Sequence, residues 1–560
     1  MAGYNLIDEQ WIPVMTGTGH ARLGLRDVFR EAGRIRLSTD TFERFVLTRF
    51  MSAILLRAVT RANPADPKSV WAGMWESGRL DVDAIDAYLT EWHDRFDLFA
   101  PATPFMQDPT LDTRRGPRPI SGIFTQEQTG LFTMDRRAEI PYDDAALALL
   151  MHQAYDSSGI KPMSKHDSRG SVGKLMPPTG LMACGNLGRQ IGVWVESDSL
   201  ARTLLANCPP YDPVTGRVTL DPADTAAWER PCQTVEELGR GVAGTADQLT
   251  IQSRRVLLHR NDNGMVDGYQ STYGRVTDRR DLEGVEPNCA WTRGSLPMPV
   301  GQHWSDPPAW ANLPGLDGNM VLEWLADTDL CDMVDLHLTG FEYKNTKPAE
   351  QLERDVRLDP HILKDEQRMM RLGRILGQIS VTITFLIDLK HIRVGDAIQV
   401  EPVEHERMRA ESAREIDDLM TASLASGNPL DETLPDRTYH RLHEFAERKA
   451  LASRNVMRAA EALIKLEHAM GAVRNALSEP QTVEPGPNET QSDIPKRGRR
   501  GTPIIRINPD DTRVTHETMR AAVEWLHDNG YPGAQPPNVY SAINRGGTAY
   551  GYRWERQKKT

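Results

Sequence analysis

Hydrophobic positions in the first hundred residues recur at helical spacing. Within residues 42–57 an α-helix would place six apolar side chains near one face, those of Phe42, Phe45, Val46, Met51, Ile54 and Leu55. This spacing predicts an amphipathic helix with one buried face. Ile85, Leu89, Trp92 and Phe96 continue the same period and predict a second helix over residues 83–96.

The pattern changes twice further along the chain. Residues 140–340 are rich in glycine and proline, and the apolar run Ile191–Val195 predicts a strand, with a helix after it at Ser199–Ala206. From about His361 helical periods return, and four helices are expected at 362–389, 404–424, 439–452 and 456–477. Four helices with short connections favour a four-helix bundle.

The last eighty residues divide into a linker and a small module. Residues 479–501 contain several prolines and polar residues and then the basic run Lys496–Arg500, a composition typical of disorder. Beyond them, a helix is expected over Thr515–Leu526, capped by Thr515. The expected fold is α+β: a mixed α/β domain over 1–360, a C-terminal four-helix bundle over 361–478, the basic linker 479–501 and an appended module over 502–560.

Charge is unevenly distributed along the 560 residues. The net charge is −12, yet the segment from Lys496 to the end holds 12 Lys and Arg against 6 Asp and Glu, so that it carries +6 and the rest −18. A basic tail on an acidic body indicates separate partners for the two parts. We find no signal peptide and no apolar run long enough to cross a membrane, so a cytoplasmic protein is expected.

Motifs for catalysis and for metal or cofactor binding are weak. The five cysteines form no C-x-x-C pair, which favours reduced structural thiols. Gly239–Gly244 matches G-x-G-x-x-G, but polar residues precede it where a dinucleotide site requires a strand. We therefore expect no enzyme, no cofactor and no metal. Two alternatives remain open: a metal-dependent nuclease whose residues form no linear motif, and a stand-alone DNA-binding regulator, motivated by the basic tail.

Two unusual motifs give the chain a family resemblance. Residues 5–14, Asn-Leu-Ile-Asp-Glu-Gln-Trp-Ile-Pro-Val, and the W-x-x-R-F-x-L-F…P-F-x-Q stretch of residues 92–107 resemble motifs of the CasA family and occur in the same order. That family supplies the large subunit of Cascade, the type I-E CRISPR surveillance complex. The resemblance extends over about residues 1–480. The aromatic residues that carry it are themselves expected to pack in the core.

The resemblance implies a function and a set of partners. The large subunit would recognise a short flanking element of duplex DNA, the PAM, while base pairing with a guide RNA reads the target. It would then help to open the strands and form an R-loop, and would dock the helicase-nuclease that degrades the target. The implied partners are guide RNA, the other Cascade subunits, double-stranded target DNA and the recruited nuclease, with no membrane.

The resemblance also assigns candidate DNA-binding residues. The glycine loop of the family matches residues 180–189, which implies PAM contacts from Gly185, Asn186 and Gly188, with Arg189 and Lys174 on phosphates; an ordinary turn is the alternative. The strand-opening hairpin matches residues 343–354. The family has a glutamine at the tip and this chain has none, so Asn345, Thr346 and Lys347 are the candidate wedge residues, and a plain surface hairpin is the alternative.

Three further sets of candidate residues follow. Arg293 is the nearest match to a basic residue of the family that discriminates among PAM sequences. Leu131, Phe132 and Thr133 match a loop that contacts the RNA handle and a neighbouring subunit. The C-terminal module lies outside the CasA resemblance and looks like the small DNA-binding repeats of intron-encoded nucleases. That likeness implies base contacts from Asn544 and Arg545 and phosphate contacts from Arg553 and Arg556; a solubility tail is the alternative.

Overall fold

A computed structural model describes most of the chain in two compact units, Met1–Pro480 and Gln481–Thr560. In the first unit the described residues are 3–375, 407, 432–451, 457, 460, 461 and 464. Within 3–375, the gaps are 114, 124–137, 166, 168–173, 176–183, 189, 232–235, 276–281, 290, 293–295, 298–318, 329–332, 345–346, 366, 369–370 and 373–374. In the second unit they are 504–508, 512–516, 519–529, 531, 539, 542–543 and 548–556.

The body of the first unit is organised around one long helix, α2 (Thr41–Ala62). Asp40 begins it by accepting hydrogen bonds from the main-chain nitrogens of Phe42 and Glu43. The prediction of a single buried face is wrong, because residues around the whole circumference are buried from Thr41 to Thr60 except Glu43 and Arg44. Neighbours on several sides explain this: α2 contacts α3 (Pro67–Ser77), α4 (Val82–Glu91), α5 (Tyr142–Tyr155), α6 (Leu200–Ala206) and α7 (Thr245–Leu249).

Two arginines of α2 are buried, and each is paired with a carboxylate from far along the chain. Arg49 donates to both carboxylate oxygens of Glu286, and the two side chains are 3% and 0% exposed. Arg57 donates to Glu229, with side-chain exposures of 4% and 3%. Buried charges need such partners, because an unpaired charge in a core is very costly. A sequence pattern that treats charged residues as exposed therefore underestimates how deeply α2 is buried.

The helix expected over residues 83–96 ends earlier than predicted, and the N-terminal segment bonds to the residues beyond its end. Helix α4 stops at Glu91, and a 3-10 turn, η1 (His93–Arg95), follows it. The Asn5 amide donates to the carbonyl of His93, and the Leu6 nitrogen donates to the carbonyl of Phe96. Trp11 and Phe96 are fully buried, which confirms the core role expected of these motif residues.

A small sheet and a short helix complete this N-terminal region. Strand β1 (Ile12–Thr16) pairs with β2 (Gly19–Leu23) on one side and β3 (Arg36–Leu37) on the other, all antiparallel. Helix α1 (Leu25–Glu31) follows β2 and buries Leu25, Val28 and Phe29.

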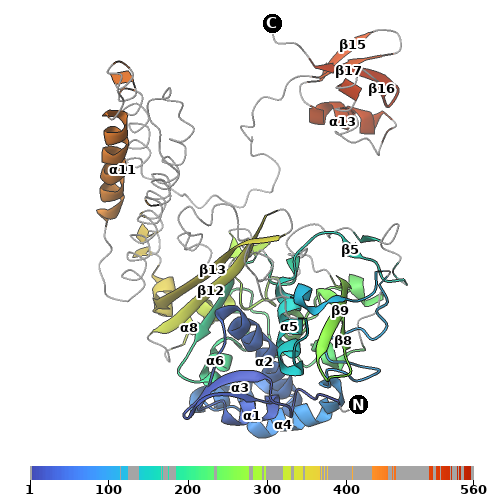
Figure 1. Ribbon diagram of the computed structural model, residues 1–560. Coiled ribbons are helices and arrows are strands. Elements are labelled where there is room, and N and C mark those ends of the chain that lie inside the picture. The colour runs from blue at the N-terminus through green and yellow to red at the C-terminus, as the bar shows by residue number, and fades with distance from the viewer. Residues whose placement is uncertain are drawn as a thin grey trace. The chain divides into compact units, whose positions relative to one another are not determined.

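Two further sheets lie on either side of α5 (Figure 1). In the first, β12 (Val334–Lys344) pairs with β13 (Lys347–Leu358) and with β7 (Gly192–Glu196), all antiparallel. In the second, β9 (Val266–Tyr273) pairs with β8 (Arg254–Arg260) and with the short β4 (Arg118–Pro119). The expected strand at Ile191–Val195 and the expected helix at Ser199–Ala206 are thus confirmed as β7 and α6, with Ser199 capping α6.

Shorter elements fill in the rest of this unit. The two-residue strands β5 (Lys161–Pro162) and β6 (Lys174–Leu175) pair with each other, as do β10 (Trp291–Thr292) and β11 (Leu296–Pro297). Helix α8 (Met320–Ala326) is buried and is capped by Asn319. The 3-10 turns are η2 (Ile120–Ile123), η5 (Ala227–Glu229), η6 (Glu236–Gly239) and η10 (Pro360–Lys364).

The expected four-helix bundle is described only in part. Helix α11 (Leu434–Leu451) corresponds to the helix expected at 439–452 and begins five residues earlier. The other three expected helices lie mostly outside the described residues, and the first of them overlaps η10. The bundle therefore remains a prediction.

The second unit has a sheet and a helix around its own core. The strand order is β15 (Arg513–His516), β14 (Ile504–Ile507), β17 (Tyr552–Arg556), β16 (Thr548–Ala549), and all pairs are antiparallel. Helix α13 (Met519–Asp528) packs through Ala522, Val523 and Leu526 against Ile504 and Trp554. The expectation that Thr515 caps this helix is wrong, because Thr515 pairs with Ile505 inside β15.

Candidate nucleic-acid interface

The C-terminal end of α5 is the place where the predicted DNA-binding segments meet. The helix begins at Tyr142, carries Asp143 and Asp144 in its first turn, and ends with Asp156 as its C-cap. The last carbonyls of any helix lack partners within it and must find donors elsewhere when they are buried. In α5 those donors come from the glycine loop, from the β12–β13 hairpin and from β8.

The glycine loop closes on two of these carbonyls. The Asn186 nitrogen donates to the Gln153 oxygen at 3.1 Å, and the Leu187 nitrogen donates to the Ala154 oxygen at 2.9 Å. Gly185 has a φ of +83°, and a Cβ atom there would lie 2.3 Å from the Ala154 oxygen. Only glycine permits both this conformation and this approach.

The β12–β13 hairpin reaches the next carbonyl. The Tyr343 hydroxyl donates to the Tyr155 oxygen at 2.6 Å, and burial raises the pKa of Tyr343 well above its usual value, which keeps the hydroxyl protonated as a donor. The Phe341 ring lies 5.0 Å from the Tyr155 ring and 4.5 Å from the Phe42 ring, measured between centroids. The last register pair is Lys344 with Lys347, so only residues 345 and 346 separate the two strands. The expected hairpin is confirmed.

A buried charge cluster lies directly behind this helix end. The Asp156 carboxylate accepts hydrogen bonds from Lys161 Nζ, at 2.6 Å, and from the Arg254 guanidinium, and all three residues are at most 6% exposed. Burial alone would raise the pKa of Asp156, but the adjacent Lys161, His152 and Arg254 lower it far below its usual range. Asp156 therefore stays ionised, and it holds both β5, through Lys161, and β8, through Arg254, at the C-terminal end of α5.

The same cluster positions the strand that carries Lys174. Lys161 belongs to β5, which pairs with β6 in the register Lys161 to Leu175. Leu175 is buried against Met163 and Tyr273, while Lys174 is exposed. Lys174 is thus available for a phosphate, as the sequence-based assignment requires.

The structure places the glycine-loop candidates differently from the DNA-facing position that the resemblance implies. Gly185, Asn186 and Gly188 are all buried, and Asn186 is 6% exposed. A Cβ atom on Gly188 would lie 1.8 Å from the Cys184 oxygen, so this glycine also serves tight packing. These three residues form the base of the loop. Segment 176–183, which precedes them in the sequence, lies outside the described residues.

Several candidate residues lie outside the described parts of the chain. They are Arg189, Arg293, Asn345, Thr346, Leu131, Phe132, Thr133, Asn544 and Arg545. Lys347 is described as the first residue of β13, Arg553 is exposed on β17, and Arg556 ends that strand. The roles assigned to all of these remain predictions.

The residues that hold the site together carry no sequence signal. Asp156, Lys161 and Arg254 belong to no motif, and Arg254 is 98 positions from Asp156 in the sequence. Tyr343 lies within the hairpin motif, but nothing in the sequence connects it with Tyr155. Their importance becomes visible only when the end of α5 is seen in three dimensions.

The G-x-G-x-x-G segment has a structural role. The described residues just before it form the 3-10 turn η6, not a strand, and α7 after it has only five residues. Arg275 donates to the carbonyls of Arg240 and Gly241 and to Asp247. The glycines therefore form a loop that is held by protein groups, and the described residues before it do not form the strand that a dinucleotide site requires.

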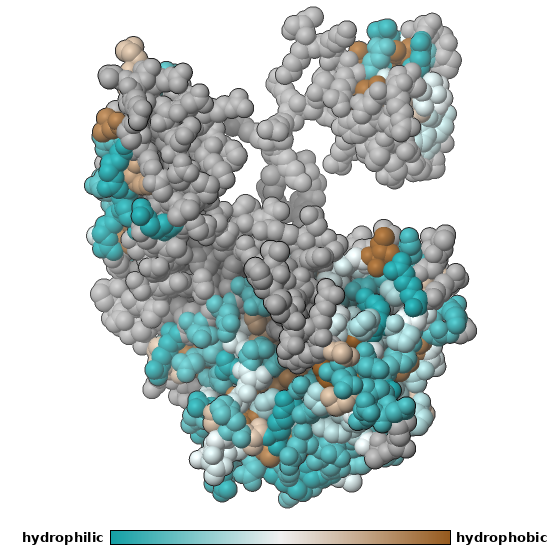
Figure 2. Space-filling view, viewed as in Figure 1, coloured by the Kyte–Doolittle hydropathy of each residue, from teal (hydrophilic) through white to brown (hydrophobic). Residues whose placement is uncertain are grey.

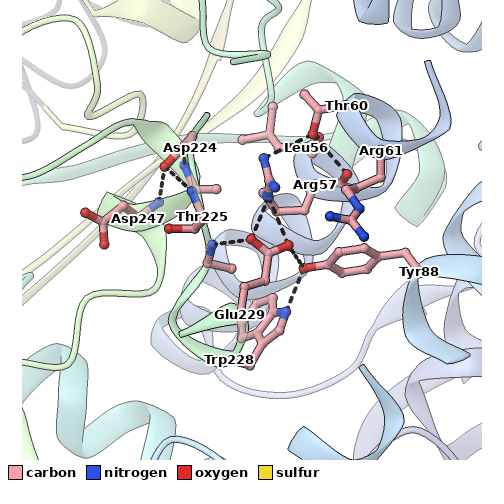
Figure 3. A network of polar contacts seen from close by, with 12 residues as sticks. Leu56, Arg57, Thr60, Arg61, Tyr88, Asp224, Thr225, Trp228, Glu229 and Asp247 are labelled. Atoms are coloured by element: carbon pink, nitrogen blue, oxygen red, sulfur yellow. Dashed lines mark hydrogen bonds and ion pairs between the residues drawn. The ribbon is translucent and has the colours of Figure 1, made fainter. Parts of the chain in front are cut away.

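Figure 3 shows how the neighbouring segment is fixed to α2 and α4. Glu229 accepts hydrogen bonds from Arg57 and from the Tyr88 hydroxyl at 2.8 Å, and the Trp228 indole donates to the same hydroxyl at 2.7 Å. Asp224 accepts from the main-chain nitrogens of Ala246 and Asp247 at the start of α7. Burial raises the pKa of Asp224 to about 6. This network holds η5 and the start of α7 against α2 and α4 in the core.

Other chemistry is sparse among the described residues. No three His, Cys, Asp or Glu side chains in that part of the chain are grouped so as to hold a metal ion. Cys184, Cys208 and Cys289 are buried free thiols, which confirms the interpretation of these three as reduced. No described helix combines the length and apolarity needed to cross a bilayer. On the face in Figure 2 the described surface is mainly hydrophilic, with small separated hydrophobic groups.

Comparison with known proteins identifies this architecture. The sequence profile of the family described as CRISPR-associated protein Cse1 matches residues 5–453. CRISPR-associated protein CasA/Cse1 of Thermus thermophilus is 32% identical over 241 residues, which span 41% of this chain and 42% of that protein. This chain thus aligns with less than half the length of that curated relative.

Solved structures agree over a longer span. The crystal structure of Cse1 from Thermobifida fusca has a TM-score of 0.68 at 25% identity and covers 84% of this chain and 98% of that one. CasA from Thermus thermophilus has a TM-score of 0.61 at 21% identity and covers 85% of this chain and all of that one. A chain of a structure described as a CRISPR RNA-guided surveillance complex has a TM-score of 0.62 at 17% identity and covers 84% of this chain and all of that one.

These matches define the class first: the α+β body is that of a CRISPR-associated protein. More particularly, the chain belongs to the Cse1 family, also called CasA, as its two N-terminal motifs indicated.

Proposed function

We propose that this chain is the large subunit of an RNA-guided antiviral surveillance complex, in which it recognises the PAM of duplex DNA, aids strand opening and docks a helicase-nuclease. The observation that carries the proposal is the family match over residues 5–453. The fold likeness to a chain of a CRISPR RNA-guided surveillance complex supports the assembly part of it. The partners are then a guide RNA, the other subunits and target DNA.

The geometry at the end of α5 supports the DNA-binding part. The base of the glycine loop and the hairpin donate hydrogen bonds to successive carbonyl oxygens of one helix. A duplex held by the loop would therefore lie beside the hairpin tip. We assign PAM contacts to the glycine loop of residues 180–189, with Gly185, Asn186 and Gly188 shaping its base and with Arg189 and Lys174 on phosphates. Asn345, Thr346 and Lys347 are the proposed wedge, and Arg293 is the proposed PAM-discriminating side chain.

The proposal is tested by co-purification followed by DNA binding. A tagged full-length chain, expressed with the remaining subunits and guide RNA of its own locus, should retain both RNA and protein partners. The assembled complex should bind duplexes that carry a matching target, and a library of randomised flanking sequences should reveal the PAM. A chain that purifies without RNA or partners, or that binds every flanking sequence equally, would contradict the proposal.

Two variants refine this experiment. Deletion of residues 126–136 should release the subunit from the complex, because this segment contains the proposed docking residues Leu131, Phe132 and Thr133. The Arg293→Ala variant should assemble normally but discriminate less among flanking sequences. A uniform loss of affinity for all duplexes would instead indicate that Arg293 contacts phosphate.

The second unit is proposed to be an accessory DNA clamp. Its exposed Arg553 and the basic composition from Lys496 onward support electrostatic contact with phosphates. Asn544 and Arg545 would lie near bases, and Arg556 would lie on a phosphate. A tether to a DNA-bound body raises the local concentration of such a module, so weak contacts suffice.

A further inference from the structure

Three successive carbonyls at the end of α5 accept hydrogen bonds from two different functional elements. The Gln153 and Ala154 oxygens accept from the glycine loop, through the Asn186 and Leu187 nitrogens at 3.1 and 2.9 Å. The Tyr155 oxygen accepts from the Tyr343 hydroxyl at 2.6 Å. Consecutive Cα atoms are about 3.8 Å apart, so the anchor points of the loop and of the hairpin are adjacent.

This shared anchor is held firmly in place. The Gln153 oxygen also accepts from Ser253 Oγ at 2.5 Å, and the Gln153 amide exchanges hydrogen bonds with the main chain of Arg254. The carboxylate of Asp156 accepts from Lys161 and Arg254 just beyond the helix. Close packing of this kind resists small displacements, so the end of α5 sets the positions of both elements.

Tyr343 is the hairpin residue that bonds to this anchor. It lies in β12, two positions before Asn345 in the sequence. A small shift at Tyr343 would therefore move the tip relative to the base pair it must separate.

We propose that Tyr343 is a positioning residue for strand opening. Through its hydrogen bond to the carbonyl of Tyr155, it keeps the hairpin tip at a constant distance from the glycine loop. This inference rests on the proposed function, since it assigns recognition to the loop and opening to the hairpin. Tyr343 itself is buried, so it acts through the hairpin and not by contact with DNA. Its hydroxyl links the reading of the PAM to the place where the duplex opens.

The Tyr343→Phe variant of the assembled complex tests this inference. The change removes one buried hydrogen bond and leaves a buried carbonyl short of a donor, an effect large enough to slow opening about tenfold. Duplex affinity, measured by anisotropy with a labelled target, should stay within about twofold because the loop keeps its own contacts. Opening is measured by the fluorescence of 2-aminopurine at the first base pair beside the PAM.

A pre-opened duplex separates a positioning role from general damage. Mismatches at the first two base pairs remove the need for a wedge, so Tyr343→Phe should form an R-loop on this duplex at the wild-type rate. The matched control is Tyr269→Phe, which removes a hydroxyl that donates to the Gly122 carbonyl at the same 2.6 Å. This control should open intact duplex at the wild-type rate, and thermal unfolding should show that both variants are folded.

The outcomes distinguish the inference from the function on which it rests. Unchanged opening by Tyr343→Phe, equal losses of binding and opening, or failure of the mismatched duplex to restore the rate would each overturn the positioning role. If the wild-type complex neither prefers a flanking sequence nor opens the duplex, the proposed function itself fails. A slow Tyr343→Phe variant that the mismatched duplex rescues supports the inference.

Discussion

Gly185 shows how one residue can shape a binding loop without touching its ligand. Its φ of +83° lies in the region that L side chains avoid, and a Cβ atom would meet main-chain atoms of Ala154 and Tyr155. Because the obstacle is the backbone of α5 and not a flexible side chain, the loop itself would have to move. The residue therefore affects DNA binding through the shape of the loop.

Replacing Gly185 with Ala should both destabilise the chain and weaken binding to PAM duplex. The expected cost is on the order of 3 kcal/mol, from conformational strain plus the displaced contact. Gly216→Ala is the matched control, because Gly216 has a φ of +71° but open space around its Cβ position, and it should cost only about 1 kcal/mol. Thermal unfolding measures the loss of stability in both variants, and titration with duplex measures the loss of affinity. Equal losses in the two variants would show that contact with the backbone of α5 does not determine the effect at Gly185.

Asp224 makes a pH-dependent contribution to stability. Burial raises its pKa from 3.8 to about 6 in the folded chain, so between these values the folded state binds more protons than the unfolded state. Stability conferred at this site therefore falls as pH rises from about 4 to 6, by on the order of 3 kcal/mol at about 1.4 kcal/mol per pKa unit.

The Asp224→Asn variant should remove this part of the pH dependence. Its overall stability should be lower at every pH, because the asparagine side chain has one accepting oxygen, whereas the Ala246 and Asp247 nitrogens donate to two different oxygens of Asp224. The difference in melting temperature between the variant and the wild type should nevertheless narrow between pH 4 and pH 7. If the two melting temperatures instead changed in parallel over this range, the pKa of Asp224 in the folded chain would not be raised.

At the residue scale, sequence reasoning found the loop but not its environment. Gly185 and Gly188 stand out as glycines before a strand, yet the backbone that requires glycine at position 185 belongs to residues 154 and 155, about thirty positions earlier. The ionised Asp156 behind it has partners five and 98 positions away. Local patterns carry no information about such contacts, so burial of the loop base could not be foreseen.

The hairpin is the element on which strand opening depends in our proposal. Its strands pair as far as Lys344 and Lys347, so the two-residue tip is presented on a long ladder whose base is buried. Replacing Asn345, Thr346 and Lys347 together with alanine should block R-loop formation more than initial duplex binding, because the ladder and the loop anchor stay intact. R-loop footprinting beside a gel-shift titration measures the two steps, and a parallel decline in both would contradict a wedge.

Element boundaries were predictable where a local signal dominates. The helix expected over Ser199–Ala206 is found as α6, with Ser199 as its cap, and the hairpin expected from the family resemblance is found at β12 and β13. Prediction failed where tertiary pairing prevailed: Arg513–His516 joins β14 as an edge strand, so that α13 begins only at Met519. Helix α2 was recognised, but the burial of its charged residues depends on partners more than 170 positions away.

At the scale of the whole molecule, the second unit offers a separable test. Ile504, Leu526 and Trp554 belong to a core of its own, distinct from that of the body. The fragment 496–560 should bind duplex DNA at low ionic strength and lose affinity as salt rises, with a slope of about one log unit per phosphate contact. A folded fragment that shows no affinity at low salt would rule the clamp out and leave the solubility-tail alternative.

The paired arginines of α2 impose an order of events on synthesis. Arg49 and Arg57 leave the ribosome early, but Glu229 and Glu286, which neutralise them, are made more than 170 residues later. At roughly 5–20 residues per second this interval lasts about 10 to 50 s. Throughout it the central helix of the body has no completed core to enter, and Arg49 stays without its carboxylate partner until residue 286 has emerged.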